Sequence, residues 1–260
     1  MIEGTAVAGK GLTVSVVTVC YNSRETIADA LESVREQSWP HKEHIVVDGA
    51  STDGTLEVVE RYRDGLARVV SEPDDGLYDA MNKGVRLASG DVICFLNADD
   101  VYVGSEVLAE VAELMAEEGL DAVYGDAEFV GRQGGCHTVR RYRSARFRPD
   151  RIGWGWMPAH PTLFLRRALF DRYGLFRTDF RIAGDFELVA RMFKDGKLRY
   201  RYLPRVLVRM RTGGVSTGGL RSRWRLNREV VRACRVNGID TNVWKVVSKY
   251  PFKILEYIVR

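Results

Sequence analysis

The 260-residue sequence lacks several features that mark whole classes of protein. It contains no run of 18 apolar residues, the minimum for a membrane-spanning helix. Its amino terminus lacks the basic head and apolar stretch of a signal peptide. Its four cysteines are widely spaced and form no Cys-x-x-Cys pair, which argues against a zinc site or a redox dithiol. Together these absences predict a reduced, cytoplasmic setting.

Two common phosphate-binding motifs are also missing. GTAVAGKG at residues 4–11 approaches the phosphate-loop pattern, but it ends in glycine where that motif has a magnesium-binding Ser or Thr. It also precedes the first apolar run instead of following it. No Gly-x-Gly-x-x-Gly follows that run, which argues against a nicotinamide-dependent enzyme. We therefore interpret residues 1–12 as a flexible leader.

Charge of opposite sign is concentrated in the two halves of the chain. Residues 1–131 contain 9 Lys and Arg against 26 Asp and Glu, whereas residues 132–260 contain 30 against 9. Such a division predicts two regions with different partners. The acidic region suits divalent cations or simply forms solvated helices. The basic region suits phosphates, nucleic acid or an anionic membrane surface.

Strand and helix patterns alternate through the first 125 residues or so. Apolar runs that predict buried strands cover residues 13–20, 44–47, 67–71, 92–96 and 122–124. Helical spacing of apolar residues follows each of the first four runs, starting near residues 23, 52, 77 and 105. This alternation predicts an α/β fold with a doubly wound, mostly parallel sheet.

Polar side chains follow three of the predicted strands, at the edge where such sheets bind their ligands. Tyr21 and Asn22 follow the first strand, Asp48 ends the second, and NADD at residues 97–100 follows the fourth. Each cluster on its own is also explained by turn capping. Carboxylates directly after a buried strand suit a hard divalent cation, which can bridge a nucleotide diphosphate.

Three segments in this order carry a family resemblance. VVTVCYNSRETIADALESVREQS, HIVVDGASTDGT and DDGLYDAMNKGVRLASGDVICFLNADD resemble the ordered motifs of family 2 glycosyltransferases, which have the GT-A fold. The closest similarity is to bacterial enzymes that build surface polysaccharides. It implies a nucleotide-sugar-binding half at residues 13–130 and an acceptor-binding, catalytic half at residues 131–219.

The resemblance also implies which residues bind the donor. Asp48 matches the acid that contacts the nucleotide base or ribose, and Val19 and Tyr21 border that pocket. Asn97-Ala98-Asp99 stands at the family's Asp-x-Asp position, with Asn in place of the first Asp. It implies Mn²⁺ or Mg²⁺ held by Asp99 with Asp100. The donor-site residues implied elsewhere in the chain are Asp79, Asn82, Lys83, Arg209 and Arg211.

The catalytic base of the family lies in a later acidic motif. Asp185 in IAGDFELVAR matches it, preceded by Gly184 where Glu is common. A carboxylate there can take the proton of an acceptor hydroxyl. Glu187 is the alternative base, and a helix N-cap role for Asp185 is the alternative without catalysis. His160 matches a segment near the acceptor.

Residues 220–260 predict a basic, amphipathic helical extension. Lysines and apolar residues recur at steps of three and four from Thr241 onward, and Pro251 is expected to interrupt the helix. Such a helix lies on an anionic membrane surface, or it docks on the core or on a second subunit of a homodimer. The upstream arginines favour the membrane surface.

The function implied by the resemblance is inverting glycosyl transfer from a nucleotide diphosphate sugar, expected to be a UDP-sugar. The acceptor would be a hydroxyl of a glycan or of a polyprenyl-diphosphate-linked glycan, on the inner face of the cytoplasmic membrane. A transferase acting on polyprenyl phosphate is an alternative. A catalytically inactive donor-binding protein and a nucleic-acid-binding protein are two more, although no nucleic-acid motif accompanies the basic half.

Overall fold

A computed structural model describes residues 11–131, 138–212 and 220–255. The expected leader therefore lies almost wholly outside the described residues, as do Cys136 and the glycine-rich segment 213–219. The division of the chain into functional halves stays a prediction.

The described chain forms one nine-stranded mixed sheet. Its strands are β1 (Val14–Cys20), β2 (Lys42–Asp48), β3 (Arg68–Ser71), β4 (Val92–Phe95), β5 (Asp100–Tyr102), β6 (Ala122–Val130), β7 (Thr138–Tyr142), β8 (Leu163–Arg166) and β9 (Tyr200–Arg211). Their order is β3-β2-β1-β4-β8-β6-β9-β5, and β7 pairs with β6. The first four strands are parallel, and β8 runs antiparallel between β4 and β6. The predicted α/β fold is confirmed.

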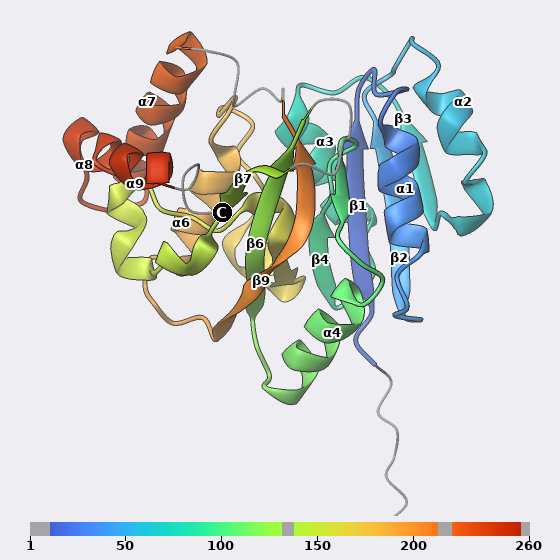
Figure 1. Cartoon of the computed structure of the whole chain (residues 1–260), viewed down its shortest axis with the longest axis horizontal. Coiled ribbons are helices and arrows are strands. Elements are labelled where there is room, and N and C mark those ends of the chain that lie inside the picture. The colour runs from blue at the N-terminus through green and yellow to red at the C-terminus, as the bar shows by residue number, and fades with distance from the viewer. Residues whose placement is uncertain (1–10, 132–137, 213–219, 256–260) are drawn as a thin grey trace, which may run out of the picture.

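Helices pack on both faces of this sheet (Figure 1). They are α1 (Ile27–Arg35), α2 (Thr55–Glu60), α3 (Leu77–Leu87), α4 (Val107–Glu117), α5 (Ala168–Tyr173), α6 (Gly184–Phe193), α7 (Leu220–Val236), α8 (Val243–Val247) and α9 (Tyr250–Leu255). In Figure 1, α2 and β3 lie at one end of the molecule, and α7, α8 and α9 gather at the other. Within the described residues, no helix has the length and apolarity needed to cross a membrane.

Strand β1 lies in the middle of the core, with all seven of its side chains buried. Val17 and Val19 pack in one cluster with α3 and α6, whereas Val14 and Val16 pack in another with α4. Alternate side chains of a strand point to opposite faces, so a strand covered on both faces is mostly apolar. The two polar side chains of β1 are buried with partners: Ser15 donates to Glu43 Oε1 at 2.6 Å, and Thr18 Oγ1 lies 2.9 Å from His44 Nε2.

Helix α3 carries its apolar stripe only in part as predicted. Met81 and Val85 are buried against the sheet, but Leu77 is 45% exposed. Leu77 is the first residue of the helix, directly after Gly76, which adopts a φ of 108°. Leu77 therefore lies at the edge of the sheet, where the helix begins, and its side chain is not buried in the core.

His44 in β2 is a buried titratable group that makes stability depend on pH. Burial lowers its pKa from 6.5 to about 3, and its ring Nε2 lies 2.9 Å from Thr18 Oγ1. The folded-state pKa lies below that of the unfolded chain, so the unfolded chain takes up the proton first as the pH falls. Stability that is fully present above pH 6.5 is therefore lost progressively toward pH 3.

We expect this loss to amount to about 2 kcal/mol at pH 5, relative to pH 7.5, and to be absent from His44→Gln. Glutamine keeps a partner for Thr18 but has no proton to gain. Urea unfolding at both pH values measures the difference, and the exposed His41→Gln is the matched control. Equal losses in the wild type and in His44→Gln would show that His44 is not the source.

After α7, the described part of the carboxyl-terminal extension consists of two short helices, α8 and α9. The break falls at Ser248 and Lys249, two residues before Pro251, which lies in the first turn of α9. Val246 is fully buried in the core, whereas Trp244 is 83% exposed. Lys249 is buried, donates from Nζ to the Gly155 carbonyl at 2.9 Å, and has a pKa lowered to about 8 by desolvation. The expected even basic stripe is therefore divided, since one of its lysines anchors the helix to the core.

Candidate functional site

The loops that follow β1 and β2 are joined to each other at the carboxyl edge of the sheet. Asn22 donates from its backbone N to Ser51 Oγ at 2.8 Å, and its side-chain Oδ1 accepts from Thr52 N at 2.9 Å. Asn22 and Ala50 both have positive φ, 49° and 60°. Such a conformation costs about 1 kcal/mol or more in a residue with a side chain, and it persists only where contacts enforce it. The rim is therefore built as a fixed surface.

Asp48 ends β2 beneath this rim and is fully buried. Its Oδ2 accepts from Ser51 N at 2.9 Å and from Ser71 Oγ at 2.7 Å, and its Oδ1 accepts from the Ser51 hydroxyl. The carboxylate thus holds the ends of β2 and β3 together. Around it, Val19 is buried and Tyr21 is 65% exposed, so the Tyr21 ring is the surface that a ligand would meet. A direct contact between Asp48 and a nucleotide stays a prediction.

The NADD motif turns sharply between β4 and β5. Asp100 N donates to the Asn97 carbonyl at 3.0 Å, and Asn97 Nδ2 donates to Asp100 Oδ2 at 2.9 Å. Asp100 is 1% exposed and pairs with Met210 of β9, whereas Asp99 is half-buried at the surface of the turn. Of the two acids predicted to bind metal, Asp99 is the one that faces outward.

Ionisation of the two neighbouring carboxylates is opposed by burial and, at Asp100, by the charge of Asp99. Burial raises the pKa of Asp99, and burial together with the charge of Asp99 raises the pKa of Asp100 well above its usual range. The Arg211 guanidinium opposes both shifts. A cation at this turn would stabilise the ionised forms.

The side chains present fit a divalent cation in part. Asn97 Oδ1 is buried and has no hydrogen-bond partner among the described residues, so an oxygen ligand stands free beside Asp99. In the part of the chain that the structure describes, no three His, Cys, Asp or Glu side chains converge into a ready-made cage. This donor set suits a metal that is held by one or two protein oxygens and completed by substrate phosphates, as magnesium commonly is.

Arg211 reaches the same rim from the end of β9. It forms an ion pair with Asp29 of α1, and its charge acts on Asp99 and Asp100. Arg209, two residues earlier, donates from Nε to Glu128 Oε1 at 2.7 Å. Both arginines were predicted to contact a diphosphate. In the structure, Arg211 lies near enough to the NADD turn to act on its aspartates, whereas Arg209 is bonded to Glu128 of β6.

Asp185 lies in the first turn of α6, and its carboxylate is held from α3. The Tyr78 hydroxyl is 3.2 Å from Asp185 Oδ1 and 2.8 Å from the Ile182 carbonyl, and Oδ1 also accepts from Phe186 N at 2.8 Å. Burial and the Asp185 charge raise the pKa of Tyr78, which keeps its hydroxyl as a donor. The N-cap of α6 is Ala183, so the N-cap interpretation of Asp185 is wrong.

The residue before Asp185 departs from the family pattern for a steric reason. A Cβ on Gly184 would lie 2.7 Å from Tyr78 Cε2. Real Cβ atoms do not approach so closely, and the ring is buried and has no room to retreat. The contact between Tyr78 and Asp185 therefore requires glycine at position 184.

His160 packs on the end of β4 and is close enough to Asp185 to feel its charge. It begins the 3₁₀ helix η4 (His160–Thr162), and its ring stacks on Phe95 at a centroid distance of 5.5 Å. Burial lowers its pKa, and the charge of Asp185 opposes that shift. Phe95 is two residues before Asn97, and Asp185 contacts Tyr78 in the first turn of α3, so both acidic sites lie toward the carboxyl edge of the sheet.

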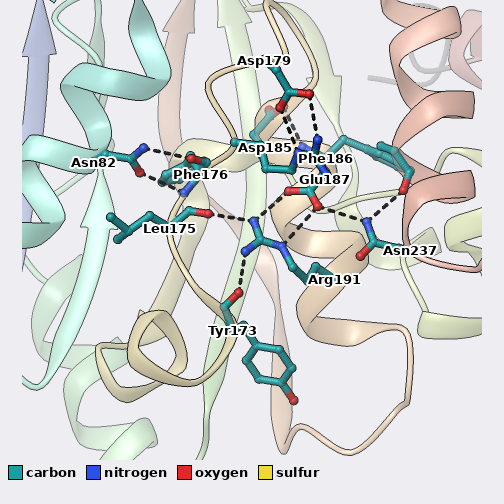
Figure 2. Close-up of polar contacts among 12 residues, drawn as sticks. Asn82, Tyr173, Leu175, Phe176, Asp179, Asp185, Phe186, Glu187, Arg191 and Asn237 are labelled. Carbon is teal, nitrogen blue, oxygen red and sulfur yellow. Dashed lines mark hydrogen bonds and ion pairs between the residues drawn. The ribbon is translucent and has the colours of Figure 1, made fainter.

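The side chains of Asn82 and Lys83 form hydrogen bonds with the protein's own backbone. The Asn82 amide bonds both the N–H and the carbonyl of Phe176, each at 2.9 Å (Figure 2). Asn82 is 4% exposed. Lys83 donates to the Pro73 carbonyl at 2.7 Å and pairs with Glu72 at 2.9 Å. The structure does not bring the Asn82 side chain to the open rim, and donor contacts by either residue stay predictions.

Glu187, the alternative base, is a member of a buried ion pair. Figure 2 shows Arg191 at its centre, and the Arg191 guanidinium lies 2.7 Å from Glu187 Oε2 and donates to the carbonyls of Tyr173 and Leu175. Asn237 donates to the same carboxylate at 3.1 Å. Glu187 is 1% exposed, and its oxygens are occupied by Arg191 and Asn237, so they are not open to a ligand. Of the two candidates, Asp185 alone retains an open position.

Two residues of the site were not identified from the sequence. Tyr78 lies near the start of the third quoted family motif, but its partner is 107 residues away in sequence. Ala50 carries its strained backbone without any sign in its residue type. A tyrosine surrounded by polar residues in DDGLYDAMNKG was the signal available for the first.

Comparisons with known proteins identify the family of the chain. The model of glycosyl transferase family 2 matches residues 15–174. The PGL/p-HBAD biosynthesis glycosyltransferase of Mycobacterium bovis is 32% identical over 196 residues, which cover 73% of this chain and 73% of the relative. The putative teichuronic acid biosynthesis glycosyltransferase TuaG of Bacillus subtilis is 38% identical over 107 residues, 40% and 42% of the two chains.

Solved structures share the fold. Residues 1–349 of S. aureus TarS, in complex with UDP-GlcNAc, superpose with a TM-score of 0.68 at 20% identity over 94% of this chain and 74% of that chain. Mannosyltransferase PcManGT from Pyrobaculum calidifontis, with GDP-Man and Mn²⁺, gives 0.65 at 24% identity over 96% and 72%. The fold, the family motifs and the extent of the matches lead to one conclusion: the chain belongs to glycosyl transferase family 2 and is a glycosyltransferase.

Proposed function

We propose that the protein transfers a sugar, with inversion, from a UDP-sugar to a hydroxyl of a cell-envelope glycan acceptor. The observation that carries the proposal is that two acidic sites lie at one edge of the sheet. Asp99 lies at the NADD turn after β4, and Asp185 is bound by Tyr78 in the first turn of α3, the helix that follows β3. A diphosphate at the first site would direct its sugar toward the second.

Asp185 is the proposed base of the transfer step. Its carboxylate takes the proton from the acceptor hydroxyl as that oxygen bonds to the anomeric carbon. The bond from the anomeric carbon to the diphosphate breaks, and its electron pair leaves with the diphosphate. Attack opposite to the leaving group inverts the configuration. Tyr78 holds the carboxylate in place through Oδ1, and the second oxygen remains for the acceptor.

Asp99 and Asn97 are the proposed protein ligands of Mn²⁺ or Mg²⁺, with Asp100 supporting the turn from beneath. When bound, such an ion neutralises the charge that develops on the departing diphosphate. Arg211 adds a positive charge at the same rim, since it already acts on both aspartates. PcManGT has been solved with GDP-Man and Mn²⁺, which supports a divalent ion in this fold.

The donor class is tested by melting the protein with UDP, GDP, CMP and dTDP, each with Mn²⁺ or with a chelator. TarS has been solved with UDP and with UDP-GlcNAc, and we expect UDP to stabilise this protein as well. A ligand present at 100 times its Kd raises the free energy of unfolding by about 2.7 kcal/mol. A rise in Tm with another nucleotide alone would show that the donor carries that nucleotide and not UDP. No rise with any nucleotide would contradict the proposed donor site.

The acceptor is proposed to lie at an anionic membrane, against which the carboxyl-terminal helices pack. Trp224 of α7 and Trp244 of α8 are 63% and 83% exposed, and the Arg228 guanidinium lies 4.6 Å from the Trp224 ring centroid. Six arginines and one acid make α7 strongly basic. Exposed aromatic rings with cationic neighbours are typical of surfaces that lie in a bilayer interface.

We expect the protein to float with phosphatidylglycerol vesicles at low salt, and less with phosphatidylcholine vesicles. Each arginine near the surface contributes about 1 kcal/mol, a contribution that salt screens. Trp244→Ser should weaken binding, whereas Val139→Ser, a variant at an exposed apolar residue of β7, should not. Equal flotation with both lipids, or none with either, would contradict a membrane-bound acceptor.

The rival functions predict other outcomes. An acceptor that is itself a polyprenyl phosphate would make transfer independent of added glycan. A catalytically inactive donor-binding protein would give the nucleotide shift without turnover. The nucleic-acid-binding interpretation is superseded, because the chain is a glycosyltransferase.

A further inference from the structure

The short segment before α6 is bound by a carboxylate from a different helix. Glu229 of α7 accepts from the backbone N–H groups of three successive residues. Its Oε2 lies 2.9 Å from Ile182 N, 2.9 Å from Ala183 N and 3.2 Å from Arg181 N. Hydrogen bonds of this kind are strengthened by the charge of the acceptor. Asp185 follows two residues after the last of these donors.

This contact supplies what α6 lacks at its own start. The N-cap residue is Ala183, whose side chain has no acceptor. Helices commonly satisfy the N-cap N–H with a Glu from their own first turn, and a negative charge there also suits the helix dipole. In α6 that role is taken by Glu229, 46 residues away in sequence from Ala183.

The same segment is held from its other side by α3. The peptide group between Ile182 and Ala183 donates its N–H, that of Ala183, to Glu229 at 2.9 Å and accepts at the Ile182 carbonyl from the Tyr78 hydroxyl at 2.8 Å. That hydroxyl is also 3.2 Å from Asp185 Oδ1. Glu229 and Tyr78 therefore fix one peptide from opposite directions, and the second of them contacts the carboxylate itself.

A second side chain of α7 binds Asp179, two residues before the segment that Glu229 contacts. Arg232, three residues after Glu229, donates to the Asp179 carbonyl at 3.0 Å and pairs with the Asp179 carboxylate. The Arg177 guanidinium lies 2.8 Å from the same carboxylate. Glu229 is the only acid among the residues of α7 and is surrounded in sequence by six arginines. Its charge runs against that composition and is explained by its contact with the three N–H groups.

We propose that Glu229 is a positioning residue for the base Asp185, and that α7 thereby links the carboxyl-terminal region to the chemical step. The proposal rests on the proposed function, since it takes Asp185 as the base. It assigns α7 a role beyond covering the core. Without the Glu229 carboxylate, the N–H groups of residues 181–183 lose their shared hydrogen-bond partner. Asp185 is then no longer held at a fixed distance from the hydroxyl that receives the sugar.

The test compares Glu229→Ala with Glu229→Gln in the full-length protein. Glutamine keeps an acceptor oxygen and alanine does not. We expect Glu229→Ala to lower kcat about 10- to 100-fold, because displacements of about 1 Å carry penalties of that order. The Kd for UDP with Mn²⁺ should stay within about twofold, since the donor rim lies on other elements, and Glu229→Gln should recover most of kcat. Arg235→Ala, an exposed variant on the same helix, is the control.

Hydrogen exchange gives a readout independent of turnover. The amides of residues 181–183 should exchange faster in Glu229→Ala and near the wild-type rate in Glu229→Gln. If the alanine variant does not fold, Glu229→Asp, which withdraws the carboxylate by one methylene, should show a smaller loss of kcat in the same direction. Wild-type kcat in a folded Glu229→Ala or Glu229→Asp would overturn the proposal.

A double-mutant cycle separates this inference from the function beneath it. If Glu229 acts through Asp185, then Glu229→Ala should cost nothing further in an Asp185→Asn background. Full turnover by Asp185→Asn alone would overturn the proposed function. An inactive Asp185→Asn, with losses that simply add in the double variant, would overturn only the role of Glu229.

Discussion

Asp185→Asn is expected to lower kcat by about 10²- to 10⁴-fold, the range that a positioned general base contributes. Asparagine is nearly isosteric, and its Oδ1 can still accept from Tyr78 and Phe186. The fold of α6 should therefore survive, and only the ability to take a proton should be lost. The change in kcat is measured with the donor identified by melting, as the rate at which the nucleoside diphosphate is released.

Binding of UDP with Mn²⁺ should be unchanged in Asp185→Asn, because the proposed donor contacts are on other strands. The control is Asp195→Asn, which removes one carboxylate from an exposed position just after α6. If Asp185→Asn keeps more than about a third of wild-type kcat, Asp185 is not the base. Because Glu187 is buried in its pair with Arg191, a base from outside this helix would then be required.

Asp99→Asn should abolish the part of UDP binding that depends on Mn²⁺. The carboxylate is the outward-facing charge of the NADD turn, and the neighbouring Asp100 is buried. For the wild type at about 100 times Kd, the expected stabilisation of about 2.7 kcal/mol corresponds to a rise in Tm of about 5–10 °C. The variant should give the same small shift with Mn²⁺ as with chelator.

The apo form of Asp99→Asn should be as stable as the wild type or slightly more stable. Burial raises the pKa of Asp99, and its charge raises the pKa of Asp100, so removing that charge relieves a cost of the folded state. Asp64→Asn, on the exposed turn after α2, is the control for loss of one surface carboxylate. A full Mn²⁺-dependent shift in Asp99→Asn would place the metal at other ligands.

The edge of the sheet that carries the site follows from the sequence pattern. Asp48 and the NADD turn each end an apolar run, and parallel strands bring such ends to one side. Asp185 could be placed there only through the family resemblance, because no periodicity relates α6 to the first four strands.

The roles of individual polar side chains depended on partners far away in sequence. Asn82 was expected to line the donor site, but both ends of its amide bond the backbone of Phe176, 94 residues later. Glu187 and Asp185 are both acids in one turn of helix. Arg191 lies at the i+4 position from Glu187, but the bond from Asn237 to the Glu187 carboxylate comes from 50 residues later in the chain. Residue type and spacing carry no information about which long-range partner occupies a polar group.

A crystal structure of the protein with UDP and Mn²⁺ tests the central claim most directly. We expect the ion to be bonded to the Asp99 carboxylate and to the diphosphate, the uracil to lie beside Asp48 and Tyr21, and the diphosphate to point toward Asp185. Nucleotide bound at any other part of the molecule, or bound at this rim with Asp99 out of reach of the ion, would contradict the account.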